Sequence, residues 1–496
     1  MGIHLGRILV TGATGYIGGR LVPRLLSEGY DVRILVRDAT RVQNYPWAHQ
    51  VEVVQGDALD EAALTEAMRG MGTAYYLIHG MQGPKPDVRR DLKAAANFAS
   101  AAEESGVQRI IYLGELATGE EKCTPYLESR HQTGRILREG KVPVTEFRAG
   151  MVIGSGSVLF EMVRYTAERQ PLFLCPRWFF TEAQPIGILN VLDYLTAALT
   201  CDESKNQVVE IGGATRMTYA QMLMTYAEVR GLKRRLVRLP LSAPVLSAHW
   251  ASMITPVQWQ VLLPLIEGLQ SPSVVSDDLA DRLFPEIRPM DFKTALNLAL
   301  GRVASDDVET SWSDALVNSL GDDRPVTLTT SEGMMLERRR LKVDLNPEAV
   351  FQSYTGLGGN RGWLFMDWAW RIRGWMDKLV GGVGLRRGRR NPDELRVGEA
   401  LDFWRVEEII PGRLIRLRAE MKVPGKAWLE FQSIPQSGGG TLLTQTAYFA
   451  PHGLAGFLYW YLLYPIHSFI FSGMIRRIAQ RAAGLVENEG KSYGFE

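Results

Sequence analysis

Three glycines spaced three residues apart, Gly12, Gly15 and Gly18, separate the apolar run 8–11 from the amphipathic stretch 21–26. This order predicts a strand, a tight turn and a helix. Gly12 suits a turn that needs a positive φ, Gly15 lets the backbone come close to a pyrophosphate, and Gly18 lets the helix lie against the strand. The N–H groups at the start of that helix would bind the phosphates. The segment therefore predicts a nucleotide-binding site.

The elements that must position this turn alternate between strands and helices. Strand patterns recur over residues 31–36, 51–54, 74–78, 109–113 and 144–148. Helical patterns, such as that over residues 92–104, lie between them. Alternating strands and helices imply a parallel sheet that is covered on both faces. We therefore expect a doubly wound α/β domain, which binds ligands at the carboxyl ends of its strands.

The end of the second predicted strand bears on the choice of coenzyme. An NAD site usually offers an Asp or Glu there to the ribose 2′-hydroxyl, whereas this chain has Arg37 followed by Asp38. A guanidinium binds the 2′-phosphate that a carboxylate would repel, so Arg37, assisted by Arg41 one turn later, favours NADP(H). The alternative is an ordinary surface arginine, with Asp38 as a helix cap or as the ribose ligand of NAD.

A second polar group follows the third predicted strand, in the segment Gly56-Asp57-Ala58. In this architecture Asp57 can accept a hydrogen bond from the adenine amino group, so we place Asp57 and Ala58 in the coenzyme site. The alternative is a turn or cap aspartate, which is common.

The composition narrows the class of protein. The chain has 496 residues, enough for two to four domains, and a formal net charge of +1. Without a strongly basic field we expect no nucleic-acid partner. The cysteines, Cys123, Cys175 and Cys201, are far apart, so neither a disulfide framework nor a metal site is expected. The N-terminus enters a strand directly, so we expect no secretory signal and a cytoplasmic location.

Together these segments resemble the short-chain dehydrogenase/reductase superfamily, in particular its atypical and extended branches, which include NmrA-like proteins and sugar-nucleotide epimerases. The matching residues are 11–18, Arg37 and Gly56-Asp57, followed by weaker matches over 184–194 and 208–220. The resemblance spans about residues 5 to 300 and implies an NAD(P)-binding Rossmann domain. It places Thr14, Tyr16 and Ile17 in the coenzyme site beside the three glycines.

The resemblance also implies a catalytic pattern, from which this chain departs. Superfamily enzymes use Tyr-x-x-x-Lys with a Ser or Thr: the Tyr exchanges a proton with the substrate oxygen, and the Lys lowers the pKa of the Tyr and holds the nicotinamide ribose. Here Tyr126 and Arg130 have that spacing and are the predicted catalytic pair. The permanent charge of Arg130 would still lower the pKa of Tyr126, but its planar fork grips ribose hydroxyls differently.

The usual Ser or Thr after the fifth strand is replaced by Gly114-Glu115-Leu116, and Thr118 is only a nearby substitute. Two further side chains are alternatives for the proton donor. Histidine titrates near neutrality, so His131 is an alternative proton donor, although a place on the helix surface is the favoured interpretation. Tyr112 is an alternative catalytic tyrosine.

The predicted domains are an NAD(P)-binding domain over residues 1–304, with a small helical substrate-side region over about 215–304, a polar linker over 305–325, and a second domain over 326–496. In the first domain, Trp178, Phe179 and Phe180 are candidates to line an apolar pocket, but core packing is favoured.

The second domain shows a different pattern. It combines a long strand over 335–343, whose arginines are expected on a solvated face, a helix from Pro347, four further strands and a terminal helix over 454–483. Leu364, Trp368, Ile372, Trp375 and Leu379 fall on one helical stripe, with Arg373 and Asp377 away from it. This order of elements resembles the START-like helix-grip fold, in which a sheet wraps the last helix around an apolar cavity.

The terminal helix has rival interpretations. No charged residue occurs from Phe431 to Ile475, and 453–474 is long enough to span a bilayer. A cavity or core helix is favoured because Pro465 and several glycines interrupt the segment. Peripheral membrane contact, supported by the basic run 385–390, and a true span are the alternatives.

These features lead to one principal hypothesis: an NADP(H)-dependent atypical short-chain oxidoreductase that acts on a hydrophobic carbonyl or quinone-like substrate, with NAD as the alternative coenzyme. The second domain would hold that small hydrophobic substrate or a lipid-like ligand. The alternatives are a non-catalytic NADPH-binding regulator, assembly factor or lipid carrier, and a nucleotide-sugar epimerase or dehydratase, against which Arg37 and Arg130 both argue.

Overall fold

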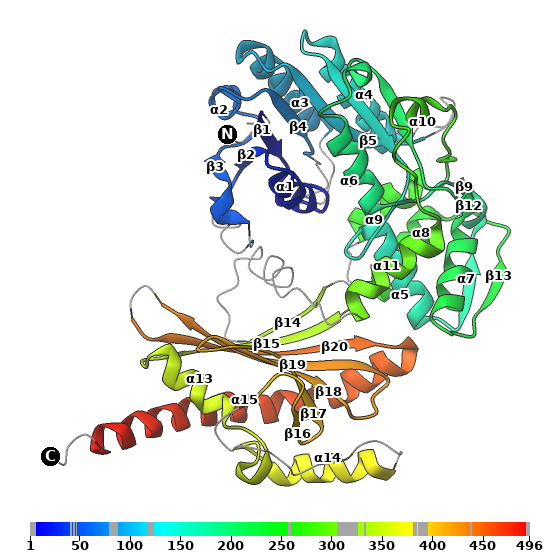
Figure 1. Cartoon of the computed structure of the whole chain (residues 1–496). Helices are drawn as coiled ribbons and strands as arrows, with labels where there is room; N and C mark the ends of the chain where they lie inside the picture. The colour runs from blue at the N-terminus through cyan, green and yellow to red at the C-terminus, as the bar shows by residue number, and fades with distance from the viewer. Residues whose placement is uncertain are drawn as a thin grey trace. The chain divides into compact units, whose positions relative to one another are not determined.

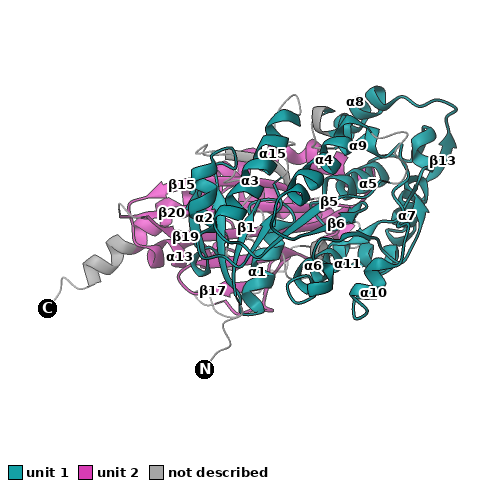
Figure 2. Cartoon of the chain, turned by 90° about the horizontal axis from the view of Figure 1, so that it is seen from above, with its two compact units in different colours: residues 1–320 teal, residues 321–496 magenta. Residues whose placement is uncertain are grey.

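The computed structural model divides the chain into two compact units, Met1–Leu320 and Gly321–Glu496, coloured teal and magenta in Figure 2. The residues that it describes are 6–39, 42, 45, 47–78, 88–117, 124–255, 259–304, 326–331, 334–379, 384, 395–436 and 439–492. The predicted linker 305–325 lies outside the described residues, and so do Arg41, Thr118, Cys123 and the basic run 385–390.

A seven-stranded sheet in the order β11-β6-β5-β4-β1-β2-β3 forms the centre of the first unit, and every neighbouring pair in it is parallel. Its strands are β1 (Arg7–Thr11), β2 (Asp31–Val36), β3 (Glu52–Gln55), β4 (Thr73–Tyr76), β5 (Arg109–Glu115), β6 (Val144–Ala149) and β11 (Val208–Ile211). The predicted parallel sheet is therefore confirmed. Its strand order reverses between β1 and β4, and in open α/β sheets the ligand crevice lies at such a point.

Helices cover both faces of this sheet, as Figure 1 shows. On one face lie α1 (Gly18–Ser27), α6 (Ile188–Ala197) and α10 (Leu279–Leu283), whose buried side chains include Leu25 and Val191. On the other lie α2 (Glu61–Met68), α3 (Val88–Glu104) and α4 (Pro125–Glu139), with Phe98 and Leu137 in a separate core. Two apolar layers on one sheet make the domain doubly wound, as the sequence predicts.

The rest of the first unit has a core of its own. There Trp178 and Phe179 are buried and pack on Tyr219, with ring centroids 5.3 and 4.9 Å apart, which confirms the favoured core role. The remaining elements of this unit are η2 (Ala48–Gln50), β7 (Val152–Ile153), α5 (Val158–Arg169), β8 (Leu172–Cys175), η4 (Arg177–Phe180), β9 (Glu182–Ala183), β10 (Ile186–Gly187), η5 (Asp202–Ser204), β12 (Met217–Thr218), α7 (Tyr219–Val229), β13 (Arg235–Arg238), α8 (Pro244–Ile254), α9 (Trp259–Gly268) and α11 (Phe292–Ala304).

The second unit contains an antiparallel sheet in the order β14-β15-β20-β19-β18-β17-β16, with a long C-terminal helix along one face (Figure 1). Its strands are β14 (Val326–Ser331), β15 (Met334–Val343), β16 (Ala400–Leu401), β17 (Trp404–Ile410), β18 (Leu414–Ala419), β19 (Gly425–Pro435) and β20 (Thr441–Pro451). Its helices are α13 (Pro347–Thr355), η6 (Gly359–Arg361), α14 (Asp367–Leu379) and α15 (Gly453–Ser492). An antiparallel sheet with a terminal helix agrees with the expected order of elements, while the helix-grip type stays a prediction.

The arginines of β15 do not lie on a solvated face, so that expectation was wrong. Arg338 and Arg339 are each 5% exposed. Arg339 pairs with Glu337 at 2.5 Å and donates to the hydroxyls of Ser468 and Ser472 on α15. A buried guanidinium needs such partners, because an unpaired charge in an apolar interior is costly. The hydrogen bonds of Arg339 to the two serines therefore join β15 to the terminal helix.

The apolar stripe of α14 is present, but it points away from the core. Trp368, Ile372 and Trp375 are 59%, 49% and 63% exposed. The inward face instead carries Trp370 and Asp377, and the Asp377 carboxylate accepts backbone N–H bonds from Gly384 and Lys422 at 2.9 and 2.7 Å. Helical spacing showed which residues share a face, but not which face meets the sheet.

Candidate active site

The glycine turn lies between β1 and α1, at the carboxyl end of β1. Gly12 has a φ of +71°, as expected, and a Cβ there would overlap the backbone carbonyl of Leu77. A Cβ on Gly18 would overlap the backbone of Gly12, so the start of α1 lies directly against the turn. The N–H of Gly15 donates to the carbonyl oxygen of Gly12 at 2.9 Å, and both Thr14 and Gly15 are exposed. The turn is thus tight and open to solvent.

The start of α1 fits a phosphate-bearing coenzyme. Its N-cap residue is Ile17, no side chain caps the helix, and its first turn has no acidic residue. Arg20 adds a positive charge beside the turn: its guanidinium lies 4.1 Å from the ring centroid of Tyr16 and donates to the carbonyl oxygens of Tyr16 and Ser155, each at 3.0 Å. A helix N-terminus without a competing carboxylate favours an anion. Sequence reasoning missed Arg20, although its place two residues after Gly18 was a signal.

The other predicted coenzyme residues follow neighbouring strands. Arg37 is exposed directly after β2, and Asp38 is half-buried beside it. Asp57 follows β3, where one carboxylate oxygen accepts the N–H of Leu59 at 3.0 Å and the other pairs with Arg90 at 3.3 Å. Asp57 therefore makes a turn contact, which was the alternative, and its contact with adenine stays a prediction. Ala58, next to it, is 7% exposed.

Tyr126 and Arg130 lie on the first turns of α4, which Thr124 caps by accepting the N–H of Leu127 at 3.4 Å. The structure brings them to Glu115, the last residue of β5. The hydroxyl of Tyr126 forms a hydrogen bond with the Glu115 carboxyl group, and Arg130 donates to the carbonyl oxygen of Leu113 at 3.3 Å. Because β1 and β5 are strands of one parallel sheet, this cluster and the glycine turn lie at the same edge.

The charges of the cluster act in opposite directions on Tyr126. Burial, and next the neighbouring Glu115, raise the pKa of Tyr126 well above its usual range, while Arg130 lowers it. Arg130 thus acts in the expected sense but is outweighed. Burial also raises the pKa of Glu115, against the lowering effect of Tyr126 and Arg130. The arrangement therefore favours the protonated form of Tyr126 and makes its proton harder to release than that of a solvent-exposed tyrosine.

The two alternative proton donors are placed differently. Tyr112 is completely buried, and its hydroxyl donates to the backbone oxygen of Arg130 at 3.0 Å, so it supports α4. His131 is half-buried rather than on the helix surface, and its Nε2 lies 3.2 Å from the carbonyl oxygen of Glu115. Burial and then Arg148 lower the pKa of His131. Sequence reasoning noted Glu115 only because it stands where the superfamily has a Ser or Thr. Its position at the end of β5 was the signal that it lies in the site.

Two family models match this chain. Residues 12–162 match a family described as NAD(P)H-binding, and residues 334–474 match a family described as a protein of unknown function, DUF2867. Residues 12–162 of the first unit thus match an NAD(P)H-binding family, in agreement with the Rossmann sheet, while the atypical short-chain type stays a prediction. The START-like assignment of the second unit stays a prediction.

Several known proteins are similar over part of the chain. A ceramide reductase of Caulobacter vibrioides is 27% identical over 265 residues, which cover 50% of this chain and 79% of that protein. A 3 beta-hydroxysteroid dehydrogenase/Delta 5→4-isomerase of Mycobacterium tuberculosis is 32% identical over 143 residues, 25% of this chain and 38% of that protein. The structure of a Citrobacter sp. triphenylmethane reductase complexed with NADP(H) covers 59% of this chain and 99% of its own, at 19% identity and a TM-score of 0.47.

Proposed function

We propose that this protein is an NADP(H)-dependent reductase of a hydrophobic carbonyl or quinone-like substrate, with Tyr126 as the proton donor. The observation that carries the proposal is the hydrogen-bonded cluster of Tyr126, Glu115 and Arg130 at the same sheet edge as the glycine turn. A domain that only binds the coenzyme needs no proton-holding group there.

Tyr126, Glu115 and Arg130 have different roles in the proposed proton transfer. The bound coenzyme supplies a hydride, so the protein must supply the proton that the substrate oxygen takes up. The Tyr126 hydroxyl donates that proton, and Glu115, whose pKa is raised by burial, returns one to Tyr126 through their hydrogen bond. The guanidinium of Arg130 stabilises the negative charge that develops on the tyrosine oxygen.

The choice of coenzyme rests on two cations. Arg37 at the end of β2 would bind the 2′-phosphate of NADPH, and Arg20 adds positive potential near the pyrophosphate site. Gly12, Gly15 and Gly18 would let the diphosphate approach the amides of residues 14–18. No carboxylate caps the start of α1, which supports binding of the more highly charged coenzyme.

Two observations support a hydrophobic substrate. The two relatives are named for ceramide and for a hydroxysteroid, which are both largely apolar molecules. The second unit encloses an apolar pocket between α14, α15 and the sheet. We propose that this unit holds the substrate or a lipid-like ligand.

Tyr126→Phe tests the reductase. NADPH oxidation with a panel of apolar ketones and quinones should fall at least a hundred-fold, while NADPH affinity, measured by nucleotide fluorescence, should stay within two-fold. His131→Gln is the matched variant one turn along α4, and it should keep most of the activity. If His131→Gln abolishes turnover and Tyr126→Phe does not, the donor is His131 and our assignment is wrong.

A second candidate is a non-catalytic NADPH-binding regulator, assembly factor or carrier. It is favoured by the strongly raised pKa of Tyr126, which makes a tyrosinate hard to form, and by Arg130 at the usual lysine position. In that case NADPH would raise the melting temperature by ligand linkage, but no apolar carbonyl compound would accelerate its oxidation.

We also propose peripheral contact between the second unit and a lipid bilayer. Helix α15 is long and apolar enough to cross a membrane by length and composition, and only 28% of its apolar window is buried. Exposed apolar side chains gather on α14 and α15, among them Trp375, Leu462 and Phe469 at 63%, 78% and 62% exposure. Sedimentation with anionic phospholipid vesicles tests the proposal: Leu462→Glu should reduce the bound fraction several-fold, and equal binding by the variant would refute this contact.

A further inference from the structure

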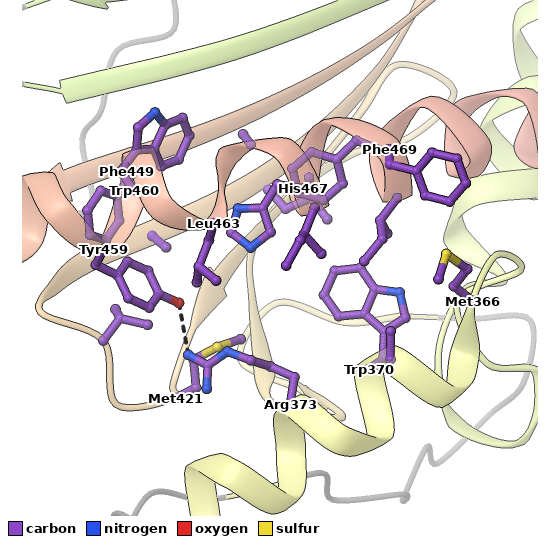
Figure 3. A pocket seen from close by; sticks show the side chains of 18 of the residues that line it. Met366, Trp370, Arg373, Met421, Phe449, Tyr459, Trp460, Leu463, His467 and Phe469 are labelled. Atoms are coloured by element: carbon purple, nitrogen blue, oxygen red, sulfur yellow. Dashed lines mark hydrogen bonds between the residues drawn. The ribbon is translucent and has the colours of Figure 1, made fainter.

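The second unit contains a pocket of about 680 Å³, a volume typical of sites for small organic molecules. Helices α14 and α15, strands β17, β19 and β20, and the connection between β18 and β19 supply its walls, which are almost entirely aromatic and aliphatic. Figure 3 shows Arg373 of α14 and Tyr459 of α15 pointing toward each other across it, with Leu463 and His467 nearby. The pocket is therefore apolar apart from one cation and a few polar atoms.

Arg373 is the charged group of this pocket. Its guanidinium donates to the hydroxyl of Tyr459 at 3.0 Å. Within the described part of the chain it has no carboxylate within ion-pairing distance, and no Asp or Glu lines the pocket. The nearest acidic residue along the helix, Asp377, is used by the backbone N–H groups of Gly384 and Lys422. A cation among apolar walls without a counter-charge favours an anionic partner.

Several indole side chains and one imidazole also line this pocket. The indole N–H groups of Trp370, Trp404 and Trp460 are buried, and none has an acceptor among the described residues. His467 adds no second positive charge, because burial and then Arg373 lower its pKa to about 4. These three indole nitrogens are shielded from solvent and so do not face the open pocket, which leaves Arg373 as the group that would meet the polar end of a ligand.

We propose that this pocket binds an anionic amphiphile: a long hydrocarbon chain lies among the aromatic walls, and a terminal carboxylate or phosphate pairs with Arg373. Arg binds both groups through two parallel N–H bonds, and Tyr459 already orients its guanidinium. The inference rests on the proposed role of the second unit as the holder of a hydrophobic ligand. It adds the charge of the ligand and the residue that recognises it.

Binding to the full-length protein without coenzyme tests this inference apart from any reduction. Hexadecanoic acid, hexadecyl phosphate and hexadecanol, each below its micelle concentration, would be titrated against tryptophan fluorescence. We expect at least one of the two anions to bind ten-fold or more tightly than the alcohol, and the acid and phosphate arms distinguish the two headgroups. Equal affinity for the alcohol and both anions would overturn the proposal.

Two arginines of one helix provide the matched variants. Arg373→Met should reduce the affinity for the anion to that for hexadecanol, and Arg373→Lys should recover part of the loss. Arg371→Met removes an exposed arginine that pairs with Asp367 at 3.0 Å, and it should change nothing. If both methionine variants weaken binding equally, Arg373 does not recognise the headgroup.

A pocket-filling variant keeps the test decisive if Arg373→Met does not fold. Ala427→Trp, on the β19 wall, should abolish binding of acid, phosphate and alcohol alike. Unchanged binding by this variant would place the amphiphile outside the pocket. These measurements involve neither coenzyme nor turnover, so a negative result leaves the reductase proposal standing. A negative result in the Tyr126→Phe test likewise leaves the amphiphile proposal standing.

Discussion

Acidification should destabilise the second unit through one half-buried imidazole, His467 of α15. The ring of His467 stacks on Phe471, with centroids 5.6 Å apart, and meets Trp460 edge-on at 6.4 Å. Burial among these rings, and then the positive charge of Arg373, lower the pKa of His467 from 6.5 to about 4. The folded protein thus holds this imidazole neutral at a pH where the unfolded chain protonates it.

The size of the effect follows from the two pKa values. Between about pH 6.5 and about pH 4 the unfolded state binds more protons, so the contribution of His467 to stability is fully present above this window and lost as the pH falls through it. For a shift from 6.5 to about 4, the loss is about 2 kcal/mol at about pH 5 and approaches about 3.4 kcal/mol below pH 4.

Urea unfolding of the full chain at about pH 7.5 and about pH 5, followed by tryptophan fluorescence, measures this loss. Comparison with His467→Gln isolates it, because the amide does not titrate and the carboxyl groups of both proteins respond alike. We expect the unmodified protein to lose about 2 kcal/mol more than the variant. His452→Gln, at an exposed histidine beside the start of α15, should keep the full loss. Equal losses in the unmodified protein and His467→Gln would refute the reasoning.

Three further predictions concern the first unit. Gly18→Val should abolish NADPH binding, measured by nucleotide fluorescence, because its side chain would overlap the backbone of Gly12; unchanged affinity would contradict the proposed phosphate site. Arg37→Ala should weaken NADPH binding roughly ten-fold, or about 1.4 kcal/mol, and leave NADH binding unchanged in calorimetry; equal effects on both coenzymes would exclude a 2′-phosphate contact. Glu115→Gln should lower the turnover of NADPH oxidation, because an amide cannot return a proton to Tyr126; unchanged turnover would exclude Glu115 from the proposed proton path.

The sequence determined the glycine turn and the parallel sheet around it. A positive φ at Gly12, the strand before it and the helix after it depend on neighbours within a few residues, so local patterns suffice to predict them. The alternation of strands and helices likewise fixes a parallel sheet, because only a crossover connection joins parallel neighbours.

Tertiary structure alone decided which groups meet across long separations. Spacing showed that Trp368, Ile372 and Trp375 share a face, but only the tertiary structure left these side chains about half exposed and placed Arg373 beside Trp368 and Ile372 in the pocket wall. The same holds for the contact of Glu115 with Tyr126, which joins the end of a strand to a separate helix. Periodicity describes one element at a time, whereas burial and ionisation depend on what the rest of the chain brings beside it.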